Sequence, residues 1–326
     1  MNRSGAARSG VALALLSSAT FATSGTFAST LLDAGWSSVA AVTFRIGIAA
    51  LVLALPAALS LRGRWQTLRG SAGMIAVYGL FAVAGAQVCY FNAVRYLPVG
   101  IALLLEYLGL VLVVIWMWAM HGQRPRRLTL GGSVISILGL ICVLDLTGTQ
   151  HVQVAGVLWG LGAAVGLALY FVLSARADDG LPALVLASGG MAIGAVALAA
   201  VGLLGLMPMH ASFGAVRFSG HEVSWLLPVA GLSLIAAVVS YVTGISAARI
   251  LGARLSSFLG LFEVVFAVIF AWMFLAQLPT PVQMLGGVLI AAGVGLVRLD
   301  ELRGAPDAPI EVDVAPREPV LAGQRD

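Results

Sequence analysis

The sequence predicts an all-α membrane protein with ten transmembrane helices, arranged as two inverted-topology repeats of five. Hydrophobic residues make up 60% of the 326-residue chain and charged residues only 10%, against roughly 25% in a typical globular domain. So few charged residues cannot give a globular protein its solvated surface, so the lipid bilayer is the expected surrounding. Ten apolar runs are each about long enough to cross it.

The ten expected helices follow one another with short, charged connections. They cover residues 10–31, 37–59, 72–94, 98–120, 128–146, 154–175, 182–206, 224–247, 250–276 and 282–299. Residues 1–9 precede them as a short N-terminus, and the first run, at about 22 residues, is longer than a signal-peptide core. Residues 207–223 are the one connection of any size, and residues 304–326, rich in proline and acids, are expected to be a disordered tail.

Arginine supplies all 18 basic residues and predicts the orientation of the chain. Fifteen arginines lie on the side shared by both termini, two (Arg95 and Arg217) lie on the opposite side, and Arg45 lies within the second span. Because cytoplasmic loops are enriched in basic residues, both termini are predicted to be cytoplasmic. The arginines stand singly or in small groups, which is typical of topology determinants and not of a nucleic-acid-binding surface.

The two halves of the chain resemble each other. Shifted by 146, "GVALALLSSATFATSGTFASTLLDAG" from Gly10 overlies "GVLWGLGAAVGLALYFVLSARADDG" from Gly156. A shift of 154 likewise places "AVRYLPVGIALLLEYLG" on "AARILGARLSSFLGLFE". Residues 10–146 and 154–299 are therefore the expected repeats. Because five is odd, the second repeat enters the membrane from the opposite side, and such inverted repeats commonly build transporters with a site near the midplane.

Two segments, "YFNAVRYLPVGIALLLEYLGLVLVVIW" and "SSFLGLFEVVFAVIFAWMFLAQLPTPVQMLGGVLIAAGVGLV", resemble the EamA family of the drug/metabolite transporter (DMT) superfamily. The resemblance covers about residues 10–299. It implies a ten-helix carrier of the bacterial inner (plasma) membrane, usually an exporter of amino acids or other small metabolites, with a central cavity between the repeats. The chain departs from the family pattern at Leu110 and Val264, where members often carry proline, and at Gln123 and Gln277, where they often carry glutamate.

Three charged residues lie deep within the predicted spans: Arg45, Glu106 and Glu263. Arg45 and Glu106 each stand about eight residues from the outer end of their span, which places both about 12 Å deep. Two interpretations are open. Either the two form a buried ion pair that only fixes helix register, or they face a cavity and bind a zwitterionic substrate, the arginine taking its carboxylate and the glutamate its ammonium group.

Glu263 lies near the middle of the predicted span 250–276 and has no partner visible in the sequence. It is either a protonated group bonded to a neighbouring helix or a site that couples protons to transport. The proton is therefore a candidate coupling ion. A monomer would suffice for transport, because ten helices enclose a complete pathway.

Other polar and aromatic side chains in the spans are candidates for the cavity wall. They are Tyr78, Gln87 and Tyr90 in the third span, Tyr107 and Trp116 in the fourth, Tyr170 in the sixth, and Ser240 and Thr243 in the eighth. Gln87 and Tyr90 share a helix face, as do Ser240 and Thr243. Such groups either bond only between helices or give a small-molecule site its few polar contacts.

Other classes of protein fit the sequence less well. All four histidines lie between spans, no H-E-x-x-H motif occurs, and no span holds two aspartates, so no enzyme, metal site or cofactor is predicted. Cys89 and Cys142 lie in apolar runs and predict no disulfide. The alternatives that stay open are an exporter of amphipathic cationic drugs and a passive channel or membrane sensor.

Overall fold

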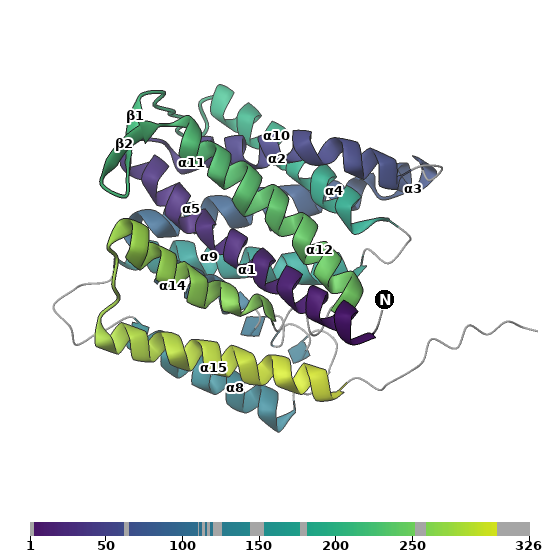
Figure 1. The fold of residues 1–326 in the computed structure, drawn as a ribbon, viewed down its shortest axis with the longest axis vertical. Coiled ribbons are helices and arrows are strands. Elements are labelled where there is room, and N and C mark those ends of the chain that lie inside the picture. Colours follow the sequence, from purple (N-terminus) through teal and green to yellow (C-terminus); the bar gives the residue numbers. More distant parts are fainter. Residues whose placement is uncertain are drawn as a thin grey trace, which may run out of the picture.

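A computed structural model describes residues 3–61, 65–109, 111–112, 115, 118–119, 126–143, 153–176, 181–251 and 259–304. These residues are helical apart from turns, short connections and one β-hairpin (Figure 1). Five of the helical segments are long and apolar enough to cross a membrane: Arg8–Asp33, Ser38–Ser60, Ala72–Tyr96, Ala183–Leu203 and Leu226–Ala247. Four shorter apolar helices accompany them. The described chain thus has the architecture of a multi-pass helical membrane protein.

The first half of the chain contains eight of the described elements. They are α1 (Arg3–Asp33), α2 (Ser38–Ser60), α3 (Trp65–Gly70), α4 (Ala72–Val77), η1 (Tyr78–Gly85), α5 (Ala86–Tyr96), α6 (Val99–Tyr107) and α8 (Arg127–Val143). Helix α2 begins where the Ser37 hydroxyl accepts a hydrogen bond from the Ala40 amide at 3.2 Å, which satisfies one of the free donors of a helix N-terminus. Pro98 immediately precedes α6, where its missing amide proton costs nothing.

The second half contains the remaining described elements. They are α9 (Val154–Arg176), α10 (Ala183–Leu203), β1 (Ala215–Phe218), β2 (His221–Ser224), α11 (Leu226–Ala230), η2 (Gly231–Val239), α12 (Ser240–Leu251), α14 (Phe262–Leu275) and α15 (Pro281–Gly304). The third predicted span therefore runs continuously through α4, η1 and α5, and the eighth through α11, η2 and α12.

Both halves depart from regular α-helix at matching places. The wide-turn π-helical segments η1 and η2 lie in the third and eighth spans. The shift of 154 found in the sequence carries residues 78–85 onto 232–239, which lie within η2. Such segments are rare in helices and concentrate at functional sites. Sequence periodicity gave no sign of them, because a π-helical insertion changes hydrogen-bond spacing without changing how apolar a helix is.

Turns interrupt the fourth and ninth predicted spans. Helix α6 ends in a turn at Leu108, and α14 begins after a turn at Leu261. Glu263 lies in the first turn of α14, two residues after the turn at Leu261. No proline marks these turns in the sequence.

The predicted connection 207–223 contains part of an antiparallel β-hairpin. Strands β1 and β2 pair with Val216 opposite Val223, and the turn places Ser219 and Gly220 at φ 50° and 80°. Two consecutive residues with positive φ are typical of the tight turn that matches strand twist. The hairpin is held against the bundle, because the Phe218 ring stacks between Phe27 of α1 and Phe274 of α14, with centroids 5.7 and 5.5 Å away.

Helices α8 and α15 lie side by side at one edge of the bundle (Figure 1). Glycines bring them together: a Cβ atom added at Gly132 would lie 2.5 Å from the Gly293 carbonyl oxygen, and one at Gly139 would lie 2.7 Å from the Gly286 carbonyl oxygen. At one end of the pair, the Thr129 hydroxyl donates to the buried Asp300 carboxylate at 2.5 Å. Small residues at helix contacts are the usual basis of close packing in membranes.

Two adjacent glycines of α8 test this packing. We expect Gly132→Ala to destabilise the protein by about 1–3 kcal/mol, because its methyl group meets backbone that cannot move aside. Gly131→Ala should be neutral or stabilising, since nothing lies within 4 Å of its Cβ position and alanine favours a helix. Thermal denaturation of the detergent-purified variants measures both. Equal midpoints for the two variants would contradict the α8–α15 contact.

Candidate functional site

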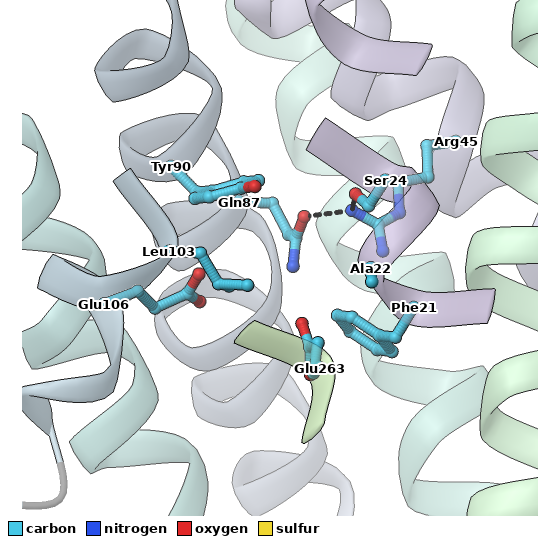
Figure 2. A pocket seen from close by; sticks show the side chains of 9 residues that line it. All are labelled: Phe21, Ala22, Ser24, Arg45, Gln87, Tyr90, Leu103, Glu106 and Glu263. Carbon is cyan, nitrogen blue, oxygen red and sulfur yellow. Dashed lines mark hydrogen bonds between the residues drawn. The ribbon is translucent and has the colours of Figure 1, made fainter. Parts of the chain in front are cut away.

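A small cavity lies among five helices (Figure 2). Its walls are formed by Phe21, Ala22 and Ser24 of α1, Arg45 of α2, Gln87 and Tyr90 of α5, Leu103 and Glu106 of α6, and Glu263 of α14. The structure thus brings together the three charged residues predicted to lie deep, with the predicted Gln87 and Tyr90 beside them. Both halves of the chain contribute to the cavity.

The Arg45 side chain is buried, with 2% of its surface exposed, and hydrogen bonds hold its guanidinium group. Nη1 donates to the Ser24 hydroxyl at 2.7 Å and to the Gln87 amide oxygen. Nη2 donates to the Ala236 carbonyl oxygen in η2 at 3.2 Å. The guanidinium carbon also lies 5.4 Å from the centre of the Phe21 ring, within range of a cation–π interaction. Three helices besides its own therefore fix this cation.

The Glu106 carboxylate lies on the opposite wall of the cavity from Arg45 (Figure 2). Among the residues that the structure describes, no hydrogen bond reaches it and no salt bridge joins it to Arg45. The ion pair that equal depth in the membrane permits is therefore not formed as a direct contact. The positive and negative groups instead face the same small space from different sides.

Glu263 contributes a second carboxylate to the same space (Figure 2). The Tyr107 hydroxyl lies 3.0 Å from its Oε2 atom and 3.1 Å from the Gly260 carbonyl oxygen, so one proton serves two acceptors. Tyr107 thus supports the site through Glu263, although it does not line the cavity itself. The link joins α6 of the first half to α14 of the second.

The remaining predicted site residues lie elsewhere. The rings of Tyr78 and Tyr170 pack against each other with centroids 5.8 Å apart, outside the cavity wall. The hydroxyls of Ser240 and Thr243 donate to carbonyl oxygens one turn earlier in the same span, at 2.9 and 2.7 Å. Neither lines this cavity. Trp116 lies outside the residues that the structure describes.

Sequence reasoning missed the contribution of α1. Ser24 is a direct partner of Arg45, and Phe21 and Ala22 complete the wall. The run "SSATFATSGT" carries many hydroxyl groups for a membrane span and could have indicated it. Gly25 lets α1 approach this closely, because a Cβ atom there would lie 2.5 Å from the Tyr90 hydroxyl oxygen.

Comparison with known proteins identifies the class of protein. The family model of the EamA-like transporter family matches residues 8–145 and 154–299. The chain belongs to this family, within the drug/metabolite transporter superfamily. It is therefore a multi-pass membrane transporter whose partners are a small-molecule substrate and the lipid bilayer. One match in each half agrees with the two-repeat architecture.

The individual proteins that the chain resembles share about a quarter of their aligned residues with it. The chain is 28% identical over 224 residues to the threonine/homoserine exporter RhtA of Escherichia coli (strain K12), covering 67% of this chain and 68% of that protein. It is 25% identical over 221 residues to an uncharacterized transporter of Archaeoglobus fulgidus, covering 68% and 73%. A solved crystal structure has a TM-score of 0.54 and 24% identity, covering 93% and 99%. That similarity shows the fold alone.

The hydroxyl of Ser24 provides a test of how Arg45 is held. Ser24→Ala removes one acceptor from a buried cation, and we expect it to lower the free energy of unfolding by about 1–3 kcal/mol. Ser246→Ala is the matched control, because that hydroxyl donates within its own helix at 2.7 Å. Thermal denaturation measures the difference. A Ser24→Ala midpoint no lower than that of the control would show that the bond contributes little.

Proposed function

We propose that this protein is a secondary transporter of the plasma membrane that exports amino acids or similar small metabolites by alternating access through the central cavity. The observation that carries the proposal is the arrangement of one guanidinium group and two carboxylates on different walls of one cavity. The similarity to the threonine/homoserine exporter RhtA supports amino acids as the substrate class.

The proposed binding mode follows from the hydrogen-bond donors of Arg45 that no described residue occupies. A guanidinium group has five N–H donors, and described residues accept from Arg45 in three hydrogen bonds. The remaining donors are suited to a substrate carboxylate, which arginine binds with paired hydrogen bonds. Glu106 receives the substrate ammonium group on the opposite wall. The Ser24 and Gln87 contacts keep the guanidinium in place before substrate arrives.

The charges on the cavity wall favour small metabolites with both a positive and a negative group over the drug-exporter alternative. A cationic drug without an anionic group would leave Arg45, the one cation among the described residues of the wall, without an opposite charge. A passive channel would conduct ions without a bound substrate, and a sensor would bind ligand without moving it.

The proposed architecture has ten spans in two repeats, 10–146 and 154–299, with opposite orientations in the membrane. The uneven distribution of arginine supports cytoplasmic termini, a cytoplasmic segment 1–9 and a cytoplasmic tail 304–326. The matching positions of η1 and η2 support an internal two-fold relationship. Inverted repeats of this kind let one fixed site open to either side in turn.

Glu263 is the proposed proton site. It lies on the cavity wall beside Glu106, and two carboxylates in one small space of low polarity do not readily both carry charge. Release of a proton from Glu263 to one side and uptake from the other would link the proton gradient to the movement of substrate. The Tyr107 hydroxyl holds the carboxylate in position during this exchange.

The role of Arg45 is tested by substrate binding and efflux. Arg45→Gln is expected to abolish the thermal stabilisation that threonine and homoserine give the purified protein, because their carboxylates lose their cation. Arg45→Lys keeps the charge without the paired donors and should retain weak binding. Arg217→Gln, on the exposed hairpin, is the control. Full stabilisation and wild-type efflux with folded Arg45→Gln would refute the proposed site.

Single-cysteine labelling tests the proposed orientation. In a background with Cys89→Ala and Cys142→Ala, we expect Glu222→Cys on the hairpin to react with a membrane-impermeant maleimide in intact cells. Gln66→Cys on α3 should react only after the membrane is permeabilised. Both positions are exposed, so access depends on the side of the membrane. The reverse pattern, or labelling of both from outside, would contradict cytoplasmic termini.

Proton coupling is tested in liposomes containing the purified protein. An imposed pH gradient should accelerate amino acid transport by the wild-type protein. In Glu263→Gln the acceleration should disappear, because the amide cannot release a proton. Glu222→Gln, an exposed acid-to-amide change, should respond like the wild type. A gradient response that survives in Glu263→Gln would remove Glu263 from the coupling mechanism.

A further inference from the structure

The charges on the cavity wall are unequal in number. Within the described part of the chain, the cavity is lined by one cation, Arg45, and by two acids, Glu106 and Glu263. None of these described groups forms a salt bridge with another. Charges kept from water are costly unless an opposite charge or a proton compensates them. A well-matched ligand therefore supplies one negative group and up to two positive ones.

An amino acid with a single ammonium group provides opposite charges for only two of these three charged groups. Its carboxylate occupies Arg45 and its ammonium group occupies Glu106, which leaves Glu263 with the Tyr107 hydroxyl alone. One neutral donor shared with a backbone carbonyl does not neutralise a carboxylate. The site then needs a proton at Glu263, as the proposed coupling mechanism supplies.

We infer that the ligands this cavity fits best are small diamino monocarboxylic acids, of which 2,4-diaminobutyrate is an example. This inference rests on the proposed function, since it uses the same carboxylate and ammonium contacts. The second ammonium group pairs with Glu263, on α14, while the first pairs with Glu106, on α6. A short side chain suits a cavity this small.

Related ligand classes match the charges less well. A plain diamine satisfies both acids but leaves Arg45 without an anion. An acidic amino acid brings a second carboxylate into a space that already holds two. A neutral amino acid leaves one wall carboxylate dependent on a proton. Among these classes, only the diamino acid pairs each of the three charged groups with an opposite charge.

Three ligands of similar size test the inference on the full-length purified protein. Homoserine and 2,4-diaminobutyrate differ only in carrying a hydroxyl or an ammonium group on the same carbon, and 1,3-diaminopropane lacks the carboxylate. We expect 2,4-diaminobutyrate to bind about ten- to a hundredfold more tightly than either of the others, the range for a bond to a charged partner. Isothermal titration and ligand-induced thermal shifts measure the dissociation constants.

Two variants test whether Glu263 is responsible for the preference for 2,4-diaminobutyrate over homoserine. The ratio of the homoserine to the 2,4-diaminobutyrate dissociation constant is expected to fall about tenfold or more in Glu263→Gln, because the second ammonium group loses its partner. Glu222→Gln on the exposed hairpin should leave this ratio unchanged. A ratio that is preserved in folded Glu263→Gln would overturn the assignment of the second ammonium group to Glu263.

Measurements on the wild-type protein and on Arg45→Gln decide the ligand class. Homoserine binding that depends on Arg45, with no tighter binding of 2,4-diaminobutyrate, would overturn this inference and leave the proposed function intact. Equal affinity for 1,3-diaminopropane would show that the carboxylate is not recognised, and would also overturn it. If none of the amino acids binds in an Arg45-dependent manner, the proposed function itself fails.

Discussion

The buried guanidinium group of Arg45 is the constraint around which the described structure is organised. A permanent cation within a membrane span must be surrounded by acceptors, because the lipid offers none. Here α1 supplies the Ser24 hydroxyl, α5 supplies the Gln87 amide oxygen and η2 supplies a backbone carbonyl. Elements from both halves of the chain must therefore converge on α2. The cavity lies where they meet, and its acids lie on other walls.

The close contacts that allow this convergence depend on small residues and on departures from regular helix. Gly25 brings α1 against Tyr90, and Gly79 of η1 packs against the backbone of Gly190 in α10. The carbonyl that accepts from Arg45 belongs to the wide-turn segment η2, where the Ser240 hydroxyl also reaches it at 2.9 Å. A backbone acceptor of a π-helical segment thus lies beside a buried charge, and π-helical segments are frequent at functional sites.

The separation of charges gives the site its chemical character. A direct salt bridge between Arg45 and an acid would neutralise both and leave a ligand little to gain. With the charged groups on different walls and no salt bridge between the described ones, a ligand that carries opposite charges can complete the set. The bound ligand then supplies the opposite charges that these groups lack within the described protein. This is the physical link between the membrane transporter class that the family defines and the amino acid substrates that we propose.

The sequence by itself determined the membrane class, the family, the similarity of the two halves and the identity of the three deep charged residues. These follow from hydropathy, from charge and from order along the chain, which do not depend on how helices are rotated. Only the tertiary structure decided the partners of Arg45, which binds Ser24, Gln87 and a carbonyl of η2 and forms no direct salt bridge with Glu106. It also decided that Ser240 bonds within its own span and that turns interrupt two predicted spans. Helices that are apolar on all sides carry no pattern that fixes which face meets which neighbour, so partners at equal depth cannot be chosen from sequence.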